Sequence, residues 1–190
     1  MTAKYSAMTP ARPVKVKIAV FMTVGLILLS IFLALGGPTG IAARRGLFGT
    51  KANLFSDLNL IAQIVFLFGL SLGAVFAHKG HISTHQYIQT GFVFFNIVLT
   101  IFIMVVAFSE NVIPGLPANL QKAFALVATI HAALGLLAIL CGVYLLLRMN
   151  QLISPRWRVS WWKDLMRFTL GLYWVVGIIG VVTYFIWYAR

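Results

Sequence analysis

The stretch AFALVATIHAALGLLAILCGVYLLL, Ala123 to Leu147, decides the fold class of this chain. It is an apolar run with one ionisable side chain, His131, near its middle. A bilayer core about 30 Å thick needs about 20 helical residues, each rising about 1.5 Å. The run is therefore long enough to span a membrane. A histidine at that depth is unfavourable unless it faces protein, so His131 is a candidate site residue.

Small residues place His131 on a packing face of this helix. Four small residues precede or follow His131 at helical spacing, namely Ala128, Gly135, Ala138 and Gly142. Small side chains let the backbone of another membrane helix approach closely. We therefore expect His131 to point into helix–helix packing and away from lipid.

The composition of the whole chain predicts a polytopic membrane protein. Of 190 residues, 61% are hydrophobic and 9% are charged, which excludes a water-soluble globule. The net charge of +12 comes from basic residues at the ends of apolar runs, where lipid headgroups explain them better than nucleic acid does. The one cysteine, Cys141, lies inside an apolar run, so a single chain can form neither a disulfide nor a thiolate metal site.

Five apolar runs predict an all-α integral membrane protein with five transmembrane helices. Residues 1–15 form a cytoplasmic basic tail, and 16–190 form a single transmembrane domain. The first helix is expected to be peripheral, because it has few polar residues and a single interior glycine, Gly25. The other four are expected to form a bundle. The predicted helices are 18–35, 58–77, 87–108, 123–147 and 165–188.

The second helix carries two local signals. Ser56 and Asp57 are expected to cap its start, where a carboxylate suits the positive helix end. Gly69, Gly73 and Ala77 follow at four-residue spacing and predict a tightly packed stripe.

The distribution of charge predicts the orientation of the chain. With the N-terminus in the cytoplasm, ten of the fifteen Lys and Arg residues lie on that side. The positive-inside rule then favours a cytoplasmic N-terminus and an external C-terminus. The five on the other side are Arg44, Arg45, Lys51, Lys122 and Arg190.

Depth along the predicted helices groups polar residues with His131. Gln63 and Asn96 lie near its level on the second and third helices, so we expect the imidazole to bond to Gln63 or Asn96. His85 lies about 24 Å deeper at about 1.5 Å per residue, so His85 and His131 cannot ligate one haem. With His78 and His81 it is expected to form a wetted cluster near lipid phosphates.

Two interpretations of the intramembrane polar residues stay open. One is an interhelical polar clamp that only holds helices together. The other is a cofactor site in which His131 ligates a haem b or a chlorin, or binds a quinone, with Asn96, Gln63 and His85 as further candidates. The three acids lie at helix ends, and no catalytic or metal-binding constellation is predicted.

Four short blocks of sequence carry a resemblance to a known family. The blocks are Asp57-Leu58-Asn59-Leu60 with Gln63, His85-Gln86-Tyr87-Ile88-Gln89 with Asn96, Ile130-His131 with Gly135, and Leu165-Met166 with Trp174, Gly180 and Tyr184. They resemble a family of small bacterial membrane proteins, the CtaM/YozB-like proteins, over about residues 57–188. The resemblance implies a link to maturation of haem–copper cytochrome oxidase, and it implies that His85 and His131 match the family's recurring histidines. Where the family often has a further histidine, this chain reads Trp161-Trp162-Lys163.

These observations predict a non-catalytic protein of a bacterial inner membrane. We expect an accessory subunit or assembly factor of a respiratory or photosynthetic electron-transfer complex, in contact with lipid and with other membrane subunits. The alternative is an electron-transfer subunit that binds its cofactor through His131. A transporter is disfavoured, because charged intramembrane residues and broken helices are lacking.

Overall fold

The computed structural model describes residues 45–116 and 118–188. Within these residues the long elements are all helical, and four helical segments are long and apolar enough to cross a membrane, as expected of a multi-pass membrane protein. The predicted first helix, 18–35, and the basic tail lie outside the described residues. The elements are α3 (Leu54–His78), α4 (Ile82–Leu99), a π-helical turn (Thr100–Met104), α5 (Val105–Asn111), α6 (Ala123–Met149) and α7 (Trp162–Tyr188), with short 3-10 turns at Ile113–Gly115, Ala118–Gln121 and Pro155–Trp157.

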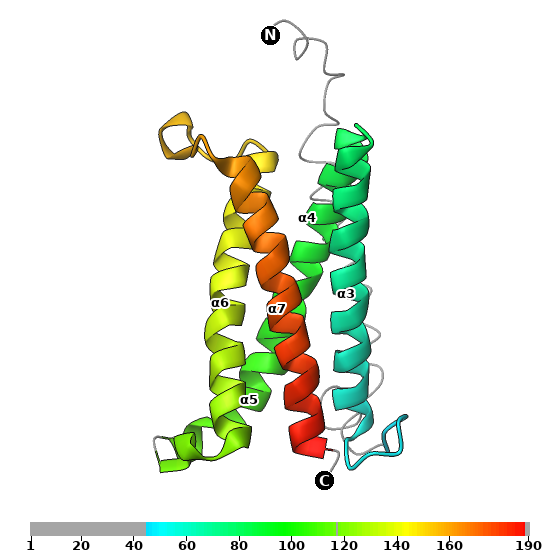
Figure 1. Cartoon of the computed structure of the whole chain (residues 1–190), viewed down its shortest axis with the longest axis vertical. Coiled ribbons are helices and arrows are strands. Elements are labelled where there is room, and N and C mark those ends of the chain that lie inside the picture. The colour runs from blue at the N-terminus through cyan, green and yellow to red at the C-terminus, as the bar shows by residue number, and fades with distance from the viewer. Residues whose placement is uncertain (1–44, 117, 189–190) are drawn as a thin grey trace, which may run out of the picture.

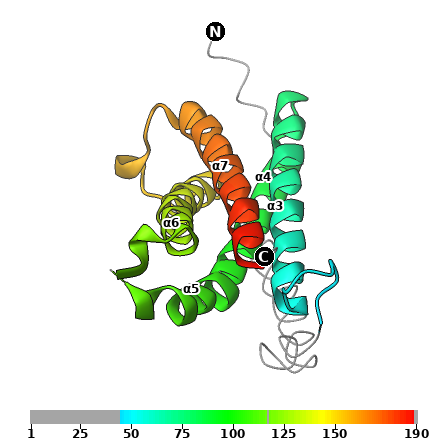
Figure 2. The same cartoon turned by 60° about the horizontal axis from the view of Figure 1, so that its bottom comes forward.

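The helices form an antiparallel bundle in which α7 lies in front of α4, with α3 and α6 on either side (Figure 1). The neighbouring pairs are α3 with α4, α4 with α6, α6 with α7, and α7 with α3. We call the end where α3 and α6 begin and α7 ends the lower end, and the opposite end the upper end. α5 continues the line of α4 and reaches the start of α6 at the lower end (Figures 1 and 2).

The four predicted spans that lie in the described residues are confirmed as helices, but their limits differ. α3 begins at Leu54, four residues earlier than predicted, because Asn53 caps it by accepting from Ser56 N at 2.9 Å. The prediction that Ser56 and Asp57 cap this helix is therefore wrong. α4 begins at Ile82 and so includes His85 in its first turn.

The small-residue stripe on α3 packs against α4. A side chain at Gly69 would overlap the Phe92 ring, and one at Gly73 would come within 2.7 Å of Gln89 Nε2. Both glycines are buried, whereas Ala77 is half-buried. The predicted close packing is thus confirmed for the two glycines, because side chains of α4 occupy the space that a larger residue would need there.

The core of the bundle lies between α3, α4 and α7. Phe66 of α3 and Tyr173 of α7 meet edge to face, with ring centroids 5.0 Å apart. Ala138 of α6 is fully buried in the same cluster. A second, smaller cluster at the lower end joins α5 and α6 through Val112, Ala125 and Ala128.

A polar clasp closes the lower end around the carboxylate of Asp57. Asp57 is fully buried and accepts from Leu47 N at 2.5 Å, from Phe48 N at 3.1 Å and from the Tyr184 hydroxyl at 2.5 Å. The Tyr184 hydroxyl also bonds to Thr50 Oγ1 at 2.9 Å. Asp57 therefore ties the loop before α3 to the end of α7.

Candidate functional site

The polar side chains of the described bundle bond across every pair of neighbouring helices. The partner is often a backbone carbonyl, which has two lone pairs and can accept a second bond beside any helical one. These bonds form a closed circuit around the four helices. They are His85 Nδ1 to Gly73 O (2.8 Å) and Gln89 Nε2 to Leu70 O (2.9 Å) between α4 and α3, Gln86 Nε2 to Met149 O (2.6 Å) and Asn150 Nδ2 to Thr90 Oγ1 (3.1 Å) between α6 and α4, His131 Nδ1 to Val176 O (3.1 Å) between α6 and α7, and Trp174 Nε1 to Ser71 Oγ (3.0 Å) between α7 and α3.

His131 belongs to this circuit, but not through the predicted partners. Its Nδ1 lies 3.1 Å from Val176 O on α7, and its Cε1 would lie 3.0 Å from a side chain at Gly180. The prediction of a bond to Gln63 or Asn96 is therefore wrong. A carbonyl can only accept, so Nδ1 carries the hydrogen, and Nε2 of the neutral ring keeps a free lone pair.

The imidazole of His131 is only partly enclosed. Its helical position lies on the buried face of α6, in line with Ala128 and Ala138, yet the imidazole is only half-buried. One turn further along, a side chain at Gly135 would meet only Val176 Cγ1, at 3.8 Å, which is ordinary contact. α7 therefore does not pack tightly against Gly135.

Contacts with α7 give the relative depth of Gln63 and His131. Gly177 packs against Leu67 of α3, and Gln63 lies one turn below Leu67. His131 lies between the levels of Val176 and Gly180. Gln63 and His131 therefore lie within about 5 Å of one level, on helices that are not neighbours. The buried Gln63 Nε2 has no hydrogen-bond partner among the described residues.

Asn96 lies elsewhere in the bundle, beside the hydroxyl of Tyr173. The Asn96 amide interacts with that hydroxyl, although the two do not meet the geometry of a full hydrogen bond. The same hydroxyl faces Gly142, where a side chain would come within 2.5 Å of it. Gly142 is three turns of α6 above His131, so Asn96 and His131 do not share a level.

His85 is not part of a wetted cluster, contrary to the prediction. Its side chain is 5% exposed, and Nδ1 donates to Gly73 O at 2.8 Å. Nε2 is buried without a partner among the described residues. His78 and His81 are exposed, so only His85 turns inward. The early start of α4 explains this, because it places His85 on the face toward α3.

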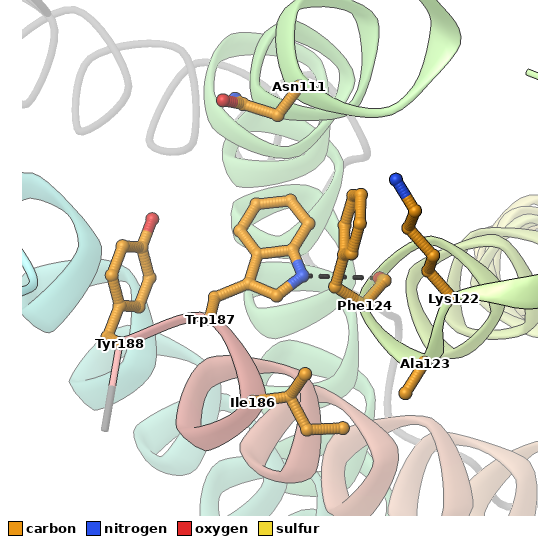
Figure 3. Close-up of a pocket in the computed structure, with 7 residues that line it drawn as sticks. All are labelled: Asn111, Lys122, Ala123, Phe124, Ile186, Trp187 and Tyr188. Atoms are coloured by element: carbon orange, nitrogen blue, oxygen red, sulfur yellow. Dashed lines mark hydrogen bonds between the residues drawn. The ribbon is translucent and has the colours of Figure 1, made fainter. Parts of the chain in front are cut away.

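Two described features escaped the sequence analysis. The first is the Asp57 clasp, which the sequence signalled only as a helix-capping carboxylate. The second is an interfacial hollow of about 620 Å³ at the lower end, between the ends of α5 and α7 and the start of α6 (Figure 3). Among the described residues, no group of three His, Cys, Asp or Glu side chains could hold a metal ion.

Comparison with models of protein families, with curated proteins and with solved structures found no match to this chain.

Proposed function

We propose that this chain is a non-catalytic accessory subunit or assembly factor of an electron-transfer complex in a bacterial inner membrane. The observation that carries the proposal is the closed circuit of interhelical polar bonds. Within the described bundle, His85, Gln86, Gln89, His131 and Trp174 all bond to a neighbouring helix. Side chains used in this way hold the helices in place, as in a scaffold that presents its outer faces to lipid and to other subunits.

The proposal includes the topology and the family. It places a fifth, peripheral helix at 18–35, the N-terminus in the cytoplasm and the C-terminus outside. Under this topology the lower end is external and the upper end is cytoplasmic. Arg156 and Arg158 in the loop before α7, with Lys163 in the first turn of α7, lie at the upper end and support it through the positive-inside rule. The resemblance to CtaM/YozB-like proteins supports a role in the maturation of an oxidase.

Absorption spectroscopy tests this proposal. The chain is purified from its own membranes in a mild detergent, with its partners, and then dissociated from them in a stronger one. We expect a Soret band in the complex and none in the isolated, still helical chain. A stoichiometric Soret band in the isolated chain, lost in His131→Leu, would contradict the accessory role.

A second candidate function rests on the free edge of His131. An imidazole whose Nδ1 is fixed by a carbonyl and whose Nε2 stays open is oriented as metal-ligating histidines are. The unpaired amide of Gln63 near the same level offers a further polar group to a haem or to the head of a quinone. In this case the chain is an electron-transfer subunit. The same spectra, with added haem in excess, identify a bound haem, whereas a bound quinone is identified by solvent extraction of the purified chain.

A further inference from the structure

The interfacial hollow lies where the bundle meets the membrane surface. Asn111 of α5, Lys122 and Phe124 at the start of α6, and Trp187 and Tyr188 at the end of α7 line it. Its volume of about 620 Å³ lies within the range of about 300–1,000 Å³ that is usual for small-molecule sites. Trp and Tyr at helix ends are typical of the headgroup level of a bilayer. We therefore expect lipid headgroups beside this hollow.

One wall of the hollow is aromatic and fixed in position. The Trp187 indole donates from Nε1 to Phe124 O at 3.2 Å, and its ring lies 6.2 Å from the Tyr188 ring. Figure 3 shows the indole between the Phe124 and Tyr188 side chains. Because the one indole N–H is already used, Trp187 offers a ligand its apolar ring and no donor. This wall, with Ile186, suits the glycerol backbone and the first part of an acyl chain.

The other wall carries a cation. Lys122 is exposed, and among the described residues no carboxylate lies within ion-pair distance of it. It is also the N-cap residue of α6, where no side chain caps the helix, so the helix end adds to the positive potential. Asn111 Nδ2 is bonded to Ala107 O, which leaves the amide oxygen to accept from a headgroup hydroxyl.

We propose that this hollow is a discrete site for one anionic phospholipid. The phosphate lies at Lys122, and the glycerol and upper acyl region lie along Trp187 and Ile186. This inference goes beyond the proposed function and does not depend on it. It differs from general attraction to the bilayer, because a hollow with one cation among its described lining residues predicts saturable binding of one lipid per chain.

Lipid titration tests the proposal. The full chain in zwitterionic phosphatidylcholine micelles is titrated with phosphatidylglycerol, and bound lipid is counted by native mass spectrometry. We expect one saturable lipid, with affinity lowered about five-fold in Lys122→Gln. The matched control is Lys51→Gln, which removes an exposed lysine from the loop at the same end but outside the hollow, and is expected to bind as the original chain does.

Three results would overturn the proposal. Equal loss in the two lysine variants would show that only the overall surface charge attracts the lipid. Graded uptake without saturation would show that no discrete site exists. Competition by soluble glycerol phosphate at the affinity of the lipid would show that the site takes a free phosphate and no lipid. Trp187→Leu, which removes the aromatic wall and keeps Lys122, is expected to weaken the lipid while leaving the weak binding of glycerol phosphate unchanged.

Discussion

The Asp57 clasp is expected to be a main determinant of stability at the lower end, and Tyr184→Phe tests it. The substitution removes one hydroxyl and leaves the ring in place. That hydroxyl donates to Asp57 Oδ1 at 2.5 Å and bonds to Thr50 Oγ1 at 2.9 Å. All three partners of Asp57 donate, so the contacts suit its carboxylate form.

The expected magnitude follows from the two lost bonds. A bond to a charged group contributes about 1.5–3 kcal/mol, and one between neutral groups about 0.5–1.5 kcal/mol. Asp57 is fully buried and Tyr184 is 7% exposed, so water does not readily replace the lost donor. We expect Tyr184→Phe to lower the free energy of unfolding by about 2–4 kcal/mol.

Unfolding in detergent with increasing SDS, followed by circular dichroism, measures this change. Tyr188→Phe is the matched control, because its hydroxyl makes one bond within the described part of the chain, from Ser56 Oγ at 2.9 Å, and none to Asp57. We expect that control to lose about 0.5–1.5 kcal/mol. Equal losses in the two variants, or no loss in Tyr184→Phe, would refute the reasoning that the buried carboxylate organises this end.

Three further outcomes are expected in the same assay. Gly69→Ala should destabilise the protein by about 1–3 kcal/mol through overpacking. Gly171→Ala should be neutral or stabilising, because an added methyl group there would have no atom within 4 Å. Equal effects of the two substitutions would place both glycines in open space. Gly142→Ala should destabilise by a similar amount, because the new methyl group would lie 2.5 Å from the Tyr173 hydroxyl. Adding Tyr173→Phe should restore most of the lost stability, and simple addition of the two effects would disprove this contact. His131→Leu should lower stability by only about 0.6 kcal/mol, the average for a polar bond between membrane helices, and a loss of several kcal/mol would show a larger role for the imidazole.

Local features of the chain were sufficient for the fold class and the spans. Hydropathy and length predicted α3, α4, α6 and α7 to within a few residues at most ends, because membrane insertion depends on summed apolar character over about 20 residues. The close packing at Gly69 and Gly73 was also predictable, since small residues at four-residue spacing permit close approach whichever helix supplies the partner.

The tertiary structure decided which groups meet. The sequence identified His131 as a packed polar residue, but its partner is Val176 O, because every backbone carbonyl of a neighbouring helix competes with the few side-chain amides. Asn96 faces Tyr173 because the rotation of each helix about its axis depends on packing against two neighbours at once. Asp57 reads locally as a helix-capping residue, and only the return of α7 to the start of α3 makes it the centre of a clasp. Composition and spacing therefore determined that the chain forms packed membrane helices, while their pairing, rotation and crossing determined every polar contact between them.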